Sequence, residues 1–96
     1  MIMFKLVRVE ITDRAYKEIQ RIPRHIVDKL QTWIDAVKLK GLERVRHISG
    51  YHDEPLKGDR VGQRSIRLNR SYRAIYEVIY GEATIVRIEE VTKHVY

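Results

Sequence analysis

Residues 64–74, RSIRLNRSYRA, carry an arginine at every third position, at 64, 67, 70 and 73. A helix would stack these arginines on one face but would mix apolar side chains among them. A hairpin with a loop at 69–71 separates the two kinds, because opposed residues of an antiparallel pair share a face. Arg67 then lies opposite Arg73, and the other face holds Ile66, Leu68, Tyr72 and Ala74. A shift of one residue would destroy this separation, so we expect this register.

Two helices and a strand are predicted before the hairpin. Residues 4–11 alternate and are rich in β-branched side chains, which predicts a strand. Thr12 or Asp13 can then cap a helix that Pro23 ends. Apolar residues recur at helical spacing over 26–37, which predicts a second, strongly amphipathic helix.

The rest of the chain predicts strands and one irregular segment. Strands are expected at 64–68, 72–80 and 83–91, and Gly81-Glu82 joins the last two. Residues 42–63 show no long element, because glycines and a proline interrupt them. The order β-α-α-β-β-β predicts an α+β domain over residues 1–96, with two N-terminal helices packed on one face of an antiparallel sheet.

The composition indicates a soluble globular protein. The chain of 96 residues is 44% hydrophobic and 33% charged, which argues against disorder. It has no apolar run long enough for a membrane span, and its first residues lack the features of a signal peptide. It has no cysteine, which excludes disulfides and thiolate metal sites and is compatible with a reducing compartment. We therefore expect a cytoplasmic protein that does not bind membranes.

The positive charge is concentrated in one segment. The net charge is +6, and residues 57–73 contain six basic residues and one acid, Asp59. Such a patch favours a polyanion as partner, since each neutralised phosphate releases a counterion. The guanidinium groups of Arg67 and Arg73 match phosphate oxygens, so they could clamp a phosphate. The alternatives are a solvated basic loop, or arginines that are neutralised by Glu77 or another carboxylate.

Acid–base groups flank this basic segment. Glu54 precedes it and His94 follows the last predicted strand, so the two could supply a base and an acid for phosphodiester cleavage. The RNA's own 2′-hydroxyl would be the nucleophile. The histidines have no HxxxH or HExxH spacing, so we expect neither a metal nor a cofactor. Spacing alone does not bring residue 54 to residue 94.

The run EPLKGDRVGQRSIRLNRSYRAIYEV at 54–78, with KHVY at 93–96, resembles the RelE superfamily of bacterial toxins, and most the YoeB- and HigB-like branches. The order of elements and the length resemble that family too. The resemblance implies the RelE-like, microbial RNase-like fold. It also implies a toxin of a type II toxin–antitoxin system, an mRNA interferase that cuts messenger RNA, usually in the A site of the 30S ribosomal subunit, and is silenced by a cognate antitoxin.

The resemblance also implies roles for single residues. Glu54 stands where YoeB-like toxins carry the catalytic glutamate, and Arg67 and Arg73 where basic residues bind the scissile phosphate. His94 matches the C-terminal histidine that acts as general acid. In YoeB-like chains a tyrosine follows that histidine directly, whereas here Val95 precedes Tyr96, so the role of Tyr96 is open. Further contacts to RNA are expected from Lys57, Arg60, Arg64, Arg70 and Lys93.

Other functions remain open at this level. ParE-like toxins of the same superfamily poison DNA gyrase, generally without the acid–base set. A non-catalytic RNA- or ribosome-binding module would need only the basic segment. The basic face could in addition bind an acidic segment of the antitoxin. Glu54 and His94 are the residues that distinguish catalysis from binding.

Overall fold

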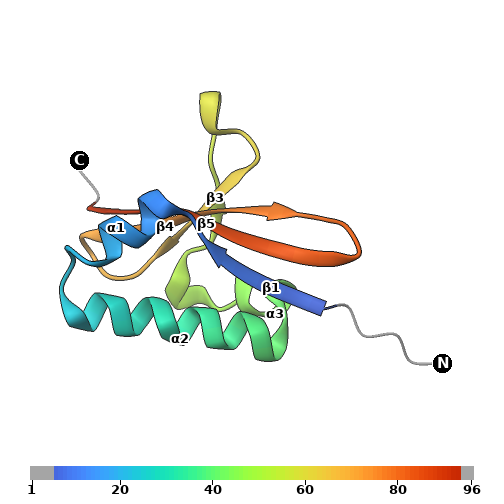
Figure 1. Ribbon diagram of the computed structural model, residues 1–96, viewed down its shortest axis with the longest axis horizontal. Coiled ribbons are helices and arrows are strands. Elements are labelled where there is room, and N and C mark those ends of the chain that lie inside the picture. The colour runs from blue at the N-terminus through green and yellow to red at the C-terminus, as the bar shows by residue number, and fades with distance from the viewer. Residues whose placement is uncertain (1–5, 94–96) are drawn as a thin grey trace.

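The computed structural model describes residues 6–93, which form one five-stranded sheet with helices packed on it (Figure 1). The strand order is β1-β5-β4-β3-β2. The helices are α1 (Asp13–Ile19), α2 (Arg24–Lys40) and α3 (Leu42–Arg46). The strands are β1 (Leu6–Ile11), β2 (Glu54–Pro55), β3 (Gln63–Arg67), β4 (Tyr72–Ile79) and β5 (Ala83–Lys93). This confirms the predicted α+β class.

The sheet is mixed, so the expectation of a purely antiparallel sheet was wrong for one pair. β1 runs parallel to β5, with Val9 paired to Val86, while the other neighbours are antiparallel. The cause is the connection: β1 is followed by a helical crossover, and the antiparallel strands then bring β5 back beside it in the same direction. Parallel strands need a crossover of this kind.

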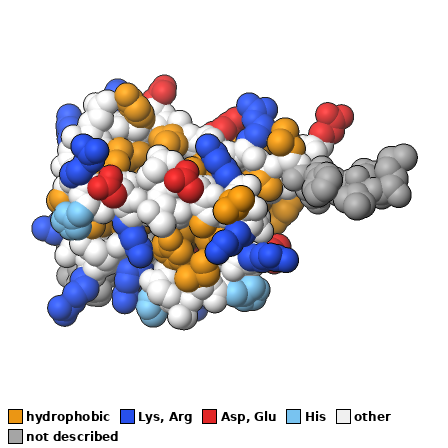
Figure 2. All heavy atoms as spheres, turned by 90° about the horizontal axis from the view of Figure 1, so that it is seen from below, with side chains coloured by type: hydrophobic (Ala, Val, Ile, Leu, Met, Phe, Trp, Pro, Cys, Tyr) orange, Lys and Arg blue, Asp and Glu red, His pale blue; other side chains and the backbone are white. Residues whose placement is uncertain are grey.

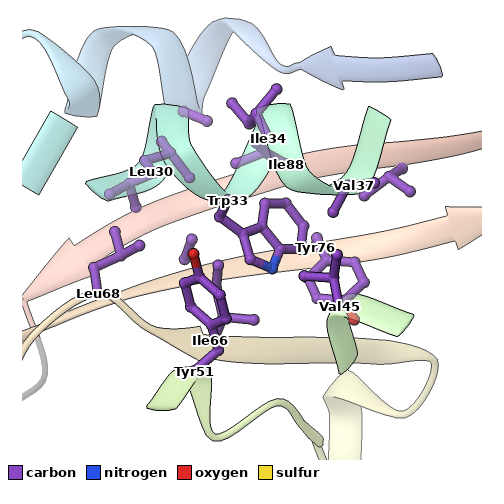
Figure 3. Close-up of a cluster of buried hydrophobic side chains, with 14 of the residues drawn as sticks. Leu30, Trp33, Ile34, Val37, Val45, Tyr51, Ile66, Leu68, Tyr76 and Ile88 are labelled. Atoms are coloured by element: carbon purple, nitrogen blue, oxygen red, sulfur yellow. The ribbon is translucent and has the colours of Figure 1, made fainter. Parts of the chain in front are cut away.

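The core lies between α2 and one face of the sheet (Figure 3). α2 buries Ile26, Leu30, Trp33, Ile34 and Val37, the apolar positions that the helical spacing predicts. The ring of Trp33 packs on Tyr76 of β4, with 5.2 Å between centroids and 47° between planes. β3 and β4 add side chains to this cluster in alternation, as strands do when one face is buried. On β5 the core residues are Val86, Ile88 and Val91, because the register between β4 and β5 shifts at Ile75 and Tyr76.

The first helix lies beside the edge of β5, where β1 has ended. Thr12 caps α1 as predicted, since its hydroxyl accepts a hydrogen bond from the Ala15 amide at 3.1 Å. The same hydroxyl donates to the carbonyl oxygen of Glu89. Glu18 accepts from the Val91 amide at 3.0 Å. These bonds satisfy backbone groups of β5 that would otherwise lack a strand partner.

The segment 42–63, expected to be irregular, contains several short elements. Besides α3 and β2 it forms two 3-10 turns, at Ser49–Tyr51 and Gly58–Arg60. Gly41 separates α2 from α3 and has a φ angle of 85°, which residues with a side chain rarely adopt. Elements of two to five residues have no usable periodicity, so their positions depend on the tertiary contacts around them.

The two faces of the sheet differ. α2 and α3 lie on one side in Figure 1, and the loop between β2 and β3 stands on the other. The α2 side carries basic and acidic side chains mixed around apolar ones (Figure 2). We call the face away from α2 the open face; it includes Glu54, Ser65, Arg67, Arg73 and Thr92.

Within residues 6–93 no helix is long and apolar enough to cross a membrane.

Candidate active site

The hairpin has the register that its sequence predicts. Arg67 pairs directly with Arg73, and Ile66 with Ala74. The loop is held by Asn69, whose side-chain oxygen accepts hydrogen bonds from two backbone amides, of Ser71 at 2.7 Å and Tyr72 at 2.8 Å. This is the local bonding by which asparagine favours turns. Two guanidinium groups therefore share the open face of the sheet.

Glu54 comes to the same place from the edge strand. Its carboxylate oxygen Oε1 lies 3.2 Å from Nη1 of Arg73, which also donates to the hydroxyl of Ser65 at 3.1 Å. The Arg73 side chain is 20% exposed and that of Glu54 is 59% exposed. Glu54 is thus a carboxylate that partly neutralises the arginine pair, the alternative left open above, and its exposed position lets a ligand reach both groups.

Asp53, the neighbour of Glu54, points to the opposite side and is buried. Its carboxylate binds Nε of Arg64 at 2.6 Å and accepts a hydrogen bond from the hydroxyl of Tyr76. Burial, followed by the hydrogen bond to Asp53 and its charge, raises the pKa of Tyr76 well above its usual value of 10.0. Burial lowers the pKa of Arg64, but the hydrogen bond and charge of Asp53 more than offset this, so that pKa is also raised.

The sequence reasoning missed Asp53. A signal existed: in an extended segment, residues 53 and 54 must face opposite sides, so a carboxylate at 53 is directed towards the core. A buried carboxylate needs a partner. Arg64 supplies that partner, so this arginine does not lie with Arg67 and Arg73 on the open face.

The other predicted RNA contacts are spread around the site. Arg60 is bound to Glu90, whose side chain is 8% exposed and also binds Arg14 at 2.9 Å. Lys57 is exposed at the start of the turn Gly58–Arg60, and Arg70 is exposed at the tip of the hairpin loop. Lys93 is exposed at the end of β5, opposite Tyr72.

Two predicted residues, His94 and Tyr96, lie outside the described residues. Thr92, two positions before His94, is paired with Arg73. The roles of His94 and Tyr96 therefore stay predictions. Among residues 6–93, no group of three or more histidine, cysteine, aspartate or glutamate side chains is placed to hold a metal ion.

Comparison with known proteins identifies the fold. No protein-family model and no curated protein matches this chain. Solved structures do. A YoeB/ParE toxin from Agrobacterium tumefaciens has a TM-score of 0.72 at 22% identity, over 92% of this chain and 99% of that one. The DinJ-YafQ toxin-antitoxin complex of E. coli gives 0.71 at 19% identity, over 93% of both chains.

The archaeal RelE-RelB complex of Pyrococcus horikoshii OT3 gives 0.70 at 22% identity, over 92% of this chain and 94% of that one. These matches cover all but a few residues of each chain, so the similarity concerns the whole domain rather than one motif. The expected architecture is thereby confirmed: this chain has the α+β fold of the RelE, YoeB and YafQ toxins.

Proposed function

We propose that this protein is a member of the RelE superfamily, the toxin of a type II toxin–antitoxin system, and that it cuts messenger RNA. The observation that carries the proposal is the contact between Glu54 and Arg73 beside Arg67, on the open face. A carboxylate can accept a proton, and guanidinium groups bind phosphate oxygens. Cleavage of a phosphodiester needs both functions in one place.

The proposed reaction uses the 2′-hydroxyl of the RNA as nucleophile. Glu54 accepts its proton while the 2′-oxygen forms a bond to the adjacent phosphorus. Arg67 and Arg73 stabilise the negative charge that develops on the phosphate oxygens. His94 donates a proton to the 5′-oxygen as the bond from phosphorus to that oxygen breaks. The products are a 2′,3′-cyclic phosphate and a 5′-hydroxyl.

The proposed partners are a cognate antitoxin, messenger RNA and the ribosome, so the proposed place of action is the cytoplasm. Two of the similar structures, DinJ-YafQ of E. coli and RelBE2 of Mycobacterium tuberculosis, are described as toxin-antitoxin complexes, which supports a protein partner for this chain. The site holds few acid–base groups of its own. A ribosome that orients the message in the A site would supply the alignment that such a site needs.

The proposal is tested by primer extension on messenger RNA in a reconstituted translation reaction. Wild-type protein is compared with Glu54→Gln and His94→Ala. Defined cuts that need ribosomes and disappear in both variants are expected, because each acid–base group contributes roughly 10²–10⁴ in rate.

Other outcomes point elsewhere. Cuts that persist in both variants would contradict the assigned base and acid. Intact message with blocked translation would indicate a binding-only inhibitor. Intact message with normal translation would favour a ParE-like action on gyrase, which a supercoiling assay measures.

A further inference from the structure

A depression of about 210 Å³ lies where β3 begins and β4 ends, beside α3. Its lining includes Arg46, Pro55, Gln63, Arg64 and Tyr80. Two guanidinium groups, an amide and an aromatic ring thus converge on one small cavity. The mechanism above uses none of Arg46, Gln63 and Tyr80.

Arg64 is held rigidly in this depression. The nearly fully buried carboxylate of Asp53, 1% exposed, fixes the guanidinium through its Nε. A guanidinium has five N–H donors, so the terminal nitrogens of Arg64 can still donate to a ligand. A donor that is already fixed loses little entropy when it binds an anion. The buried ion pair therefore prepares Arg64 for an anionic ligand.

Arg46 supplies a second cation whose present partner is easily replaced. It binds Glu43 at 3.2 Å, three residues earlier on α3, and the side chain of Glu43 is 79% exposed. Exposed pairs of this kind stabilise a protein by about 0–1 kcal/mol. A phosphate can compete for Arg46 at little cost.

Tyr80 and Gln63 supply what a nucleobase needs. Tyr80 is 69% exposed just after β4, so the face of its ring is accessible to a base that stacks on it. Gln63 has its side-chain oxygen fixed by Nε of Arg60 at 2.9 Å, which leaves its amide nitrogen to donate. Single-stranded RNA is recognised by stacking of bases on aromatic rings and by hydrogen bonds to base edges.

The depression is next to the candidate active site. Pro55 lines it, and Glu54, the residue before Pro55, lies on the open face. β2 is the edge strand of the sheet. An RNA strand bound at Glu54 can therefore pass around this edge into the depression. Gln63, which lines the depression, precedes Arg67 by four residues on β3. The rise of a strand separates the two backbone positions by roughly 13 Å.

We propose that this depression binds a nucleotide of the RNA that flanks the cleaved bond, with the base on Tyr80 and the phosphate between Arg46 and Arg64. The inference rests on the proposed function, since it assigns the same RNA substrate a second point of contact. In this arrangement Tyr80, Arg46 and Gln63 determine the affinity for RNA and the preference for the base next to the cleaved bond.

The test is fluorescence anisotropy with a labelled single-stranded RNA. All variants carry Glu54→Gln so that the RNA stays intact. Tyr80→Ala is expected to raise the Kd by roughly 5- to 150-fold, the range that stacking of a base on an aromatic ring supplies. Arg46→Ala is also expected to raise the Kd, because it removes a contact with the phosphate. Tyr80→Phe, which keeps the ring, should restore most of the affinity.

Matched controls are present in the chain. Tyr16 is an exposed tyrosine on α1 and Arg44 an exposed arginine on α3, and neither lines the depression. Tyr16→Ala and Arg44→Ala should change the Kd less than twofold. The inference is overturned if Tyr80→Ala behaves like Tyr16→Ala while Arg73→Ala still weakens binding. If the Glu54→Gln protein binds no free RNA at all, this inference is overturned, whereas the proposed function, which is tested on ribosomes, is not.

Discussion

At the scale of single residues, Arg73 connects the parts of the candidate site. It lies opposite Arg67, binds Glu54 from β2 and binds Ser65 from β3. Two like charges directly opposed destabilise a sheet unless a negative group lies between them. Glu54 meets part of that need in the free protein. A bound phosphate would replace Glu54 as the anion paired with Arg73, so that Glu54 could accept a proton.

Replacement of Arg73 by alanine is expected to reduce the rate of RNA cleavage by about 10²–10³, the usual loss when one donor to a developing negative charge is removed. The measurement is the single-turnover rate of message cleavage on ribosomes. Arg87→Ala is the matched control, because Arg87 lies on β5 on the same face of the sheet as Arg73 but pairs with Glu10 of β1. Equal rates in the two variants would remove Arg73 from the site.

Tyr76 yields a prediction about pH. Its pKa is raised in the folded state, so its contribution to stability is fully present below pH 10 and is lost as the pH rises through the folded-state pKa. In the folded protein this hydroxyl should therefore stay protonated at pH 10. A titration of ultraviolet absorbance near pH 10 should show the same tyrosinate amplitude for wild type and Tyr76→Phe. A smaller amplitude in the variant would contradict the buried contact with Asp53.

At the scale of elements, β2 carries the proposed base although it has only two residues. β2 pairs with β3 at two positions, opposite Arg64 and Ser65, and so short a pairing holds a strand only weakly. The buried contacts of Asp53 with Arg64 and Tyr76 supply the additional anchor. Asp53 thus keeps Glu54 within reach of Arg73 from the other side of the sheet.

Asp53→Asn should therefore lower the free energy of unfolding by roughly 3 kcal/mol, the low end for breaking a buried ion pair, because Arg64 is 21% exposed. Urea unfolding measures this. Asp35→Asn is the control, since Asp35 is exposed and its side chain accepts only from Gln31, at 2.9 Å, among the described residues. A loss no larger than that of the control would show that Asp53 does not anchor β2.

The elements also show what the sequence can predict. The hairpin register followed from the segregation of Arg67 and Arg73 from apolar residues, which only one alignment achieves. α2 followed from its helical spacing. α3 and β2 did not, since elements this short are positioned by contacts with distant residues rather than by their own pattern.

At the scale of the whole molecule, the pairing of β1 with β5 decides the topology. The paired residues, such as Val9 and Val86, are far apart in the sequence. No pattern in either segment indicates whether the two strands pair parallel or antiparallel. The order of the longer elements was predictable, but α3, β2 and the mixed character of the sheet were not. The close overlap with toxins of 19–22% identity shows that this topology persists although most side chains differ.

The same distance in sequence limits the prediction of the site. Glu54 and Arg73 were assigned to the same site from a resemblance, but their contact at 3.2 Å was not predicted, since it depends on β2 lying next to β3. Asp53 and the depression at Tyr80 were not predicted, because each depends on elements that meet only in the folded protein.

The most direct test of the central claim, cleavage by attack of the 2′-hydroxyl, is to determine the chemical ends of the cleaved message. RNA cut by the wild-type protein on ribosomes is analysed by mass spectrometry. We predict a 2′,3′-cyclic phosphate on the upstream fragment and a 5′-hydroxyl on the downstream one. A 3′-hydroxyl paired with a 5′-phosphate would contradict the account, because water rather than the RNA would then have been the nucleophile.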